Sequence, residues 1–316
     1  MPNSLINKRR LEFDLARGVA VFLMIFQHFW ILVVSYFFNT PKLDNLIYLS
    51  ATALVAPVFL FLMGSSTVFS SKQKPKLIFI RGLKLIALGY LLSFFRFFLP
   101  LISLEKIGLI KISEVIYRFE AIYYLLQIDI FHIAGLSLIL LAFLKKLKLE
   151  EKYYLVIAAS IFIISPFLWK IKLAGFWQLL IDPFLGTSNY VVFPAFPWLA
   201  YSLLGFYFGK KLLENKGQEE RFYKFSLKMF KPILIISIFW LAIDIVMSQH
   251  TYANHGLGIG LFISSLIICW LSFLYFNKET IPTKIADTLS LWGRKVTAIF
   301  VWQWLIIAWL AILIRI

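Results

Sequence analysis

Long, continuous apolar blocks separated by short polar stretches restrict what this chain can fold into. The blocks are about 17 to 25 residues long, which is the length that an α-helix needs to cross a hydrocarbon core of about 30 Å. A backbone in lipid must satisfy its own hydrogen bonds, and this leaves only helices or a closed barrel. Because the blocks do not alternate as barrel strands do, we predict an all-α fold, a polytopic transmembrane helical bundle.

About nine spans are expected from the number of blocks. Composition agrees, since 61% of the 316 residues are hydrophobic and 15% are charged, against about 45–50% and about 25% in average soluble domains. The first block is too long for a signal peptide. No internal repeat is apparent, so we interpret residues 1–316 as a single integral membrane domain. The spans are placed near residues 13–38, 47–69, 78–99, 121–144, 153–169, 193–209, 232–248, 257–276 and 297–314.

The distribution of Lys and Arg predicts the orientation of the bundle. Most loop cations lie on the side of the N-terminus, and the positive-inside rule makes that side cytoplasmic. We therefore expect a multi-pass protein of the inner (plasma) membrane with a cytoplasmic N-terminus. The same rule explains the formal charge of +16, so no nucleic-acid partner is predicted. Membrane lipids are expected partners: the basic stretch 210–231 is predicted to lie on anionic headgroups, and the outer segments 100–120 and 170–192 to contain interfacial helices.

The first span carries ionisable side chains, which are costly in a bilayer and indicate a functional site by default. At 100° per residue, Asp14, Arg17 and His28 project from one face of this helix. A neutral imidazole facing the bundle interior could act as a general base. The alternative is that Asp14 and Arg17 form an ion pair that ends the helix, with His28 hydrogen-bonded to a neighbouring helix.

The fourth span, 121–144, contains Gln127, Asp129 and His132. Asp129 and His132 are three residues apart and are therefore expected to be neighbours on a helix surface. A carboxylate beside an imidazole fixes its tautomer and raises its basicity, which suits a general base. The alternative is a polar pair that only holds two helices together. Asp244, near the outer end of span 232–248, is a further candidate and is assigned with Asp14 to substrate binding.

Four basic residues lie at the cytoplasmic ends of spans, namely Arg17, Arg81, Lys84 and Arg294. Arg and Lys make charge-assisted hydrogen bonds to phosphate, so these residues are candidates for an anion site that holds the phosphates of a cytoplasmic cofactor. The alternative is that each side chain extends to a lipid phosphate.

Metal and disulfide chemistry are not expected. His250 and His255 are five residues apart in an outer loop that offers no Cys or carboxylate to complete a zinc site, so we predict no metal. The single cysteine, Cys269, lies in an apolar block and excludes a disulfide within one chain.

The start of the chain resembles the transmembrane acyltransferases related to heparan-alpha-glucosaminide N-acetyltransferase, including its uncharacterised bacterial branch. The family signature, a basic residue followed by D-x-x-R-G, reads here as Arg10, Asp14, Arg17 and Gly18. Arg17 and His28 also match the R-x10-H spacing of the wider superfamily. Further similar blocks follow in order, namely APVFLFLMGSS, IRGLKLIALGYLL, LLQIDIFHIAGLSLILL, FPAFPWLAYSLLGFYFGK and LSLWGRKVTAIFVWQWL.

The resemblance implies transfer of an acyl group, expected to be acetyl, from cytoplasmic acyl-CoA to an amine or hydroxyl of an envelope sugar or lipid on the outer side. His28 would be catalytic, aided by Asp129 and His132, and the four basic residues would receive the CoA phosphates. The heparan enzyme carries its catalytic histidine in the outer loop after the first span, whereas the corresponding loop here, 39–46, contains none. The reacting centre would therefore lie deeper.

Two other functions remain open on the sequence. A secondary transporter or lipid flippase would use the same charges to carry substrate or protons, and broken helices with inverted repeats would favour it. An enzymatically silent envelope scaffold would have a dry interior with fully paired charges. The sequence also leaves the acceptor and the oligomeric state open, and a homo-oligomer is compatible with it.

Overall fold

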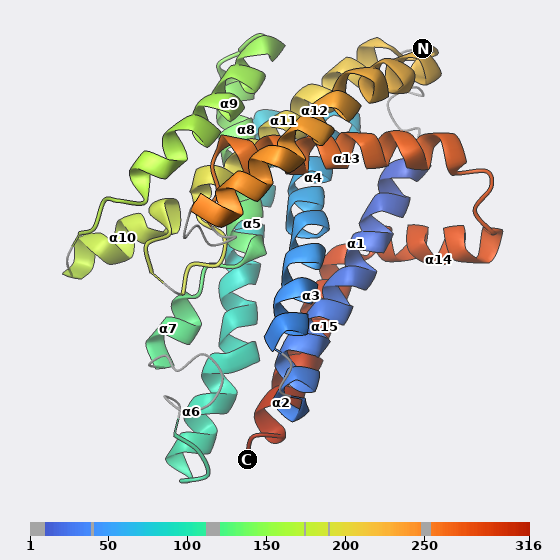
Figure 1. Cartoon of the computed structure of the whole chain (residues 1–316). Helices are drawn as coiled ribbons and strands as arrows, with labels where there is room; N and C mark the ends of the chain where they lie inside the picture. The colour runs from blue at the N-terminus through green and yellow to red at the C-terminus, as the bar shows by residue number, and fades with distance from the viewer. Residues whose placement is uncertain (1–9, 39–40, 112–120, 174, 189, 248–253) are drawn as a thin grey trace.

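The computed structural model describes residues 10–38, 41–111, 121–173, 175–188, 190–247 and 254–316. Regular structure in these ranges is helical (Figure 1), which confirms the all-α prediction. Among these described residues, one β-bridge joins Ile128 to Val191, through hydrogen bonds from Ile128 N–H to the Tyr190 carbonyl (3.1 Å) and from Val192 N–H to the Ile128 carbonyl (3.1 Å).

Five of the described helical segments are long and apolar enough to cross a membrane, so the count of about nine spans is not confirmed. A shorter apolar helix covers Ala56–Phe69. The five segments agree with five of the predicted spans to within several residues. They are Leu11–Phe37, Pro75–Lys106, Glu151–Leu168, Leu257–Asn277 and Val296–Leu313.

Two of these segments contain a π-helical turn. The first runs through α1 (Leu11–Phe29), η1 (Trp30–Val34) and α2 (Ser35–Phe37). The second runs through α5 (Pro75–Ser93), η2 (Phe94–Phe98) and α6 (Leu99–Lys106). Such turns are rare in proteins overall. Those that occur are often found at functional sites, because the extra residue redirects the side chains of that turn. Arg96 lies in η2.

Two predicted spans are interrupted, and the prediction of continuous helices there is wrong. The span 47–69 is divided into α3 (Pro41–Leu54) and α4 (Ala56–Phe69), and Pro57 lies in the first turn of α4, where its missing N–H does no harm. The span 121–144 is divided into α7 (Ala121–Leu126) and α8 (Ile130–Lys146). Asp129 precedes α8 and caps its N-terminus, with its carboxylate accepting from Ile130 N–H at 2.6 Å.

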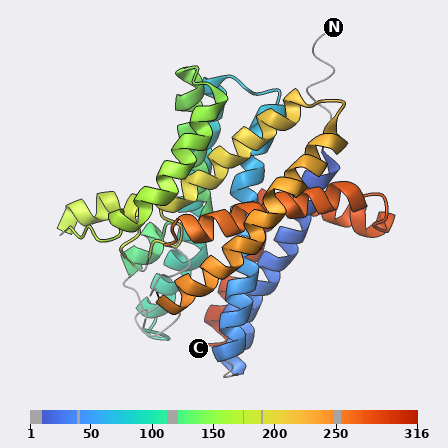
Figure 2. The same ribbon diagram turned by 45° about the horizontal axis from the view of Figure 1, so that its top comes forward.

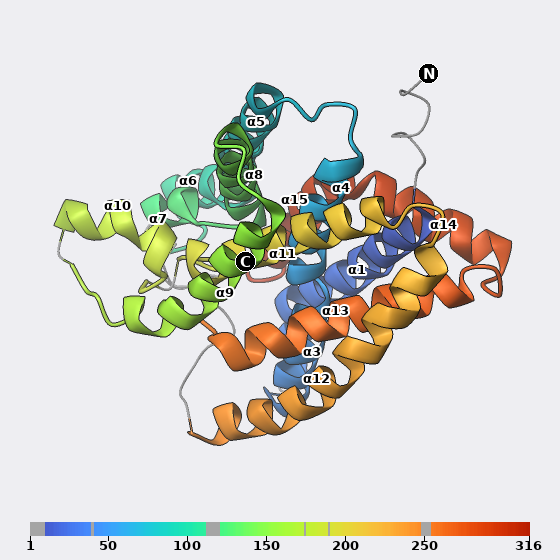
Figure 3. The ribbon, with the colours of Figure 1, turned by 90° about the horizontal axis from the view of Figure 1, so that it is seen from above.

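The second half of the chain wraps around these segments. Within 170–192, α10 projects sideways from the bundle (Figures 1 and 3), and the basic stretch 210–231 joins two helices that diverge from each other (Figure 2). In Figure 1, α14 runs crosswise and α15 descends to the C-terminus. The helices are α9 (Glu151–Leu168), α10 (Gly175–Leu185), α11 (Ala195–Glu214), α12 (Glu219–Met247), α13 (Leu257–Asn277), α14 (Thr283–Arg294) and α15 (Val296–Leu313).

Glycines allow the closest helix contacts. A Cβ on Gly205 of α11 would overlap the Phe61 carbonyl of α4, and a Cβ on Gly64 of α4 would overlap the Ser202 carbonyl of α11. At this separation the two backbones touch directly, which is how helices associate in lipid, where no hydrophobic force drives them together. The contact fixes α4, one wall of the site described next.

Candidate functional site

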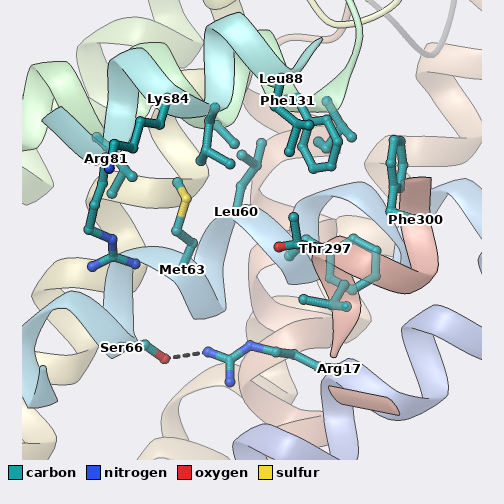
Figure 4. Close-up of a pocket in the computed structure, with 16 residues that line it drawn as sticks. Arg17, Leu60, Met63, Ser66, Arg81, Lys84, Leu88, Phe131, Thr297 and Phe300 are labelled. Carbon is teal, nitrogen blue, oxygen red and sulfur yellow. Dashed lines mark hydrogen bonds between the residues drawn. The ribbon is translucent and has the colours of Figure 1, made fainter. Parts of the chain in front are cut away.

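A pocket of about 450 Å³ lies between α1, α4, α5, α8 and α15. Three of the four basic residues singled out in the sequence line it, namely Arg17, Arg81 and Lys84. The rest of the lining is mainly apolar and includes Met63, Phe131 and Phe300 (Figure 4). We call this the cationic pocket. Its lining combines cations with an apolar wall, as a ligand with phosphates and an organic arm requires.

Arg17 is held in a fixed position at one side of the cationic pocket. Its guanidinium donates to the Asp14 carboxylate (3.3 Å), to the Leu62 carbonyl (2.9 Å) and to the Ser66 hydroxyl (Figure 4). Asp14 is buried and does not line the pocket. The ion pair between Asp14 and Arg17 that the sequence left open as an alternative is therefore formed. Arg17 lines the pocket all the same.

Arg81 and Lys84 are the pocket cations that are not engaged by a neighbouring side chain in the described part of the chain. Both project from α5, both are exposed, and neither has a hydrogen-bond or ion-pair partner among the described residues. By contrast, Arg294 donates to Ser290 of its own helix (2.8 Å) and does not line the pocket. Asp244 lies in α12, but its side chain falls outside the described part of the structure.

A second group of polar side chains lies beyond the Phe131 and Phe300 end of the pocket, and we call it the polar centre. Arg96 is 1% exposed, and its two terminal nitrogens donate to Asp129 (2.6 Å) and Gln127 (2.8 Å). The helix break makes this possible, because it frees Gln127 and Asp129 from helical geometry. The polar centre comprises His28, Arg96, Gln127, Asp129, His132, Gln303 and Trp304.

His28 belongs to the polar centre and does not line the cationic pocket. Its Nδ1 atom is 3.1–3.2 Å from the amide group of Gln303 on α15. Its ring centre lies 4.2 Å from that of Trp304. Trp304 also contacts Arg96, whose guanidinium carbon is 4.3 Å from the ring centre. Asp129 and Arg96 are close enough to act electrostatically on His28. The sequence-predicted residues His28, Asp129 and His132 thus meet in one centre.

The expected relation between Asp129 and His132 needs correction. The backbone N–H of Asp129, not its carboxylate, contacts the imidazole, donating to Nδ1 of His132 at 3.1 Å. A neutral ring that accepts at Nδ1 carries its proton on Nε2, so His132 is arranged as a hydrogen-bond donor and not as a base. Its ring packs on Gly89 and lies 4.4 Å from the Tyr90 ring.

Several buried polar atoms near Arg96 have no hydrogen-bond partner within the described structure. They are the Ser93 hydroxyl, Nε of Arg96, Nε2 of His132 and Nε1 of Trp304. A buried polar group without a partner costs free energy, so such groups in a native protein usually bind water or a ligand. Arg96 was not among the residues predicted for the site, although an intramembrane arginine is itself a functional signal. Gln303 and Trp304 carried no comparable signal.

The cationic pocket and the polar centre are adjacent but separated. The rings of Phe131 and Phe300 lie 4.6 Å apart between their centres, and both line the pocket. Phe300 in turn lies 6.4 Å from Trp304 of the polar centre. These two phenylalanines therefore lie between the lining of the pocket and Trp304, which contacts His28.

Metal-ligating side chains do not form a cluster in the described ranges. His255 is buried and bonded to the Tyr201 hydroxyl at 2.7 Å. His250 falls outside the described residues.

These features define a helical membrane protein with a buried polar centre next to a cationic pocket. Residues 9–249 match the family model of the heparan-alpha-glucosaminide N-acetyltransferase catalytic domain. The chain therefore belongs to this family of membrane acetyltransferases, as the resemblance of its first span implied. Comparison with curated proteins and with solved structures gives no match.

Proposed function

We propose that the protein transfers an acetyl group from cytoplasmic acetyl-CoA to a hydroxyl or amine of an envelope glycan or lipid on the outer side of the inner membrane. One observation carries the proposal: in a chain of this family, a pocket lined by Arg17, Arg81 and Lys84 adjoins a centre that contains His28. The three cations would bind the phosphates of CoA through charge-assisted hydrogen bonds. The apolar wall would hold the arm that carries the thioester.

The chemical step needs a base, and His28 suits this role better than His132. When Nδ1 of His28 donates to the Gln303 carbonyl oxygen, Nε2 keeps its lone pair and can accept a proton. The acceptor oxygen or nitrogen attacks the thioester carbonyl carbon while His28 takes its proton. The C–S bond then breaks, and the CoA thiolate leaves and takes the proton back from the imidazolium.

The unpartnered N–H groups of the polar centre would stabilise the charge that develops. Attack on a thioester places negative charge on the carbonyl oxygen, and fixed donors lower that barrier. Nε of Arg96 and Nε1 of Trp304 are buried donors without a described partner. The bonds from Arg96 to Asp129 and Gln127 hold its guanidinium in place. Asp129 is in this view a positioning residue.

The test is acetyl transfer by purified protein in liposomes supplied with radiolabelled acetyl-CoA. His28→Ala should abolish turnover, and Arg81→Ala with Lys84→Ala should raise KM for acetyl-CoA, because the phosphates lose two of their three cations. Lys72→Ala, an exposed cation outside the pocket, is the matched control. Full turnover in His28→Ala would exclude the catalytic role of this residue.

One observation favours a second candidate, a secondary transporter. The interruption between α7 and α8 places an ion pair at a broken helix, which is a feature of transporter sites. Flux of a solute across liposomes that depends on an ion gradient and not on CoA would support this function. Acetyl transfer without such flux would reject it.

A further inference from the structure

A second cleft, of about 760 Å³, lies between α11 and α12 and shares no lining residue with the cationic pocket. The two helices diverge from their common connection, as Figures 2 and 3 show, and α13 crosses the space between them. Residues of α9 complete the wall. Neither the polar centre nor the proposed transfer reaction uses this cleft.

Polarity is graded along the cleft. Its polar lining is concentrated where α11 ends and α12 begins, at Lys211, Asn215, Gln218 and Arg221. Farther from this junction the lining is almost entirely apolar and includes side chains such as Phe225, Met229, Ile233 and Leu261. A ligand that matches this wall has a polar group at one end and a long apolar part, which is the form of a lipid.

The charge at the polar end favours an anionic group. Lys211 is already engaged by Glu151 (3.0 Å) and Glu214 (2.8 Å), and hydrogen bonds to Glu214 and Glu151 raise the pKa of Lys211 above its usual value. Arg221 is exposed and has no ion-pair partner among the described residues. The positive charge that is free to bind a ligand therefore comes from Arg221, and Gln218 beside it adds an amide donor.

The cleft wall also contains two hydroxyl groups without a hydrogen-bond partner. Ser264 and Ser265 of α13 are both buried, and neither hydroxyl has a partner among the described residues. Ser272 of the same helix is also buried, but its hydroxyl donates to the Ile268 carbonyl at 2.8 Å, as a serine inside a helix commonly does. Because both oxygen atoms are shielded from solvent, these hydroxyls add polarity to the wall but do not by themselves offer a hydrogen bond to a ligand.

From this gradient and this charge we propose that the cleft binds one anionic phospholipid, with its headgroup at Arg221 and Gln218 and an acyl chain between α12 and α13. A free phosphate would satisfy the charge but leave the apolar wall exposed. A neutral lipid would fill the wall but gain nothing from Arg221.

The experiment is lipid binding to the delipidated full-length protein in mild detergent, measured by native mass spectrometry. Phosphatidylglycerol should bind about fivefold more tightly than phosphatidylcholine, which is the preference expected of one cation near a headgroup at about 1 kcal/mol. Arg221→Glu should remove this preference, because phosphatidylglycerol then loses its favourable charge contact while the zwitterionic headgroup of phosphatidylcholine is affected less. Lys228→Glu makes the same charge change at an exposed site on α12 outside the cleft and should keep the preference.

A second variant tests the apolar wall. Leu261 lines the cleft and is 41% exposed, so Leu261→Trp can narrow the cleft without disturbing the core. It should weaken binding of both lipids. Equal binding of the two lipids by the wild type, or equal effects of Arg221→Glu and Lys228→Glu, would overturn the proposal. So would displacement of the lipid by inorganic phosphate, since a site that phosphate can occupy does not depend on the chain.

Discussion

The ion pair between Arg96 and Asp129 gives the sharpest stability prediction. Both side chains are buried and their N–O distance is 2.6 Å. Replacing Arg96 by Met keeps an apolar stem of similar length but leaves the Asp129 carboxylate, among the described residues, with backbone N–H partners alone, at Ile130 and His132. Breaking a buried pair in this way costs about 3–5 kcal/mol, because the remaining charge is uncompensated.

The double variant Arg96→Met with Asp129→Asn should be more stable than Arg96→Met alone. Asparagine carries no charge, and it caps a helix about as well as aspartate, so α8 keeps its N-cap. We expect the second substitution to recover about 1–3 kcal/mol, the range of coupling between residues in direct contact.

Thermal unfolding in detergent, followed by circular dichroism, measures both effects. A loss of about 3–5 kcal/mol corresponds to a decrease in Tm of roughly 5 to 8 °C for a chain of this size. Lys224→Met removes the exposed pair between Lys224 and Glu220, whose side chains are 67% and 63% exposed, and should leave Tm unchanged. If Asp129→Asn lowered Tm equally in the presence and absence of Arg96, the two residues would not be coupled and the argument would fail.

Three further predictions concern the site and its walls. Trp304→Phe keeps an aromatic ring but removes the N–H donor, and should lower kcat about 100-fold with little change in KM for acetyl-CoA. The control is Trp302→Phe, at a residue 65% exposed on the same helix, which should have no effect on kcat. Equal activity of the two variants would exclude a donor role for Trp304. Phe300→Leu should open the barrier between pocket and polar centre and increase release of free CoA without acceptor, because water then reaches the thioester; unchanged release would show that the ring is not a barrier. Gly205→Ala should push α11 away from the Phe61 carbonyl and lower stability by about 1–3 kcal/mol, measured as a decrease in Tm; a wild-type Tm would contradict the close contact.

The composition of the chain was sufficient to predict helices in a membrane and five of the spans, because block length and hydropathy are local properties. It was not sufficient for the breaks. The helix breaks at Val55 and at 127–129 have apolar sequence on both sides, so an average of hydropathy over a window does not detect them. A capping signal was nevertheless present, since Asp129 is followed three residues later by His132, and together they form a capping box.

Helix periodicity predicted which residues share a face but not which helices meet. It placed Arg17 and His28 on one face of α1, yet Arg17 reaches the cationic pocket while His28 contacts Gln303 on α15. Arg81 and Lys84, near the start of α5, line the pocket, and their predicted role in phosphate binding stays a prediction. Arg294 does not line the pocket. It lies at the end of α14, a helix that the sequence analysis did not predict, and its side chain donates to Ser290 of the same helix. Such pairings depend on tertiary packing that one sequence does not encode locally.

The single β-bridge has a mechanical consequence for the polar centre. Ile128 is bonded on both sides to the segment 190–192, and Asp129 is the next residue along the chain. A displacement of residues 190–192 would therefore be transmitted across one peptide unit to the carboxylate that binds Arg96. A molecule bound near Tyr190 could in this way change the ion pair between Asp129 and Arg96 without entering the helical bundle.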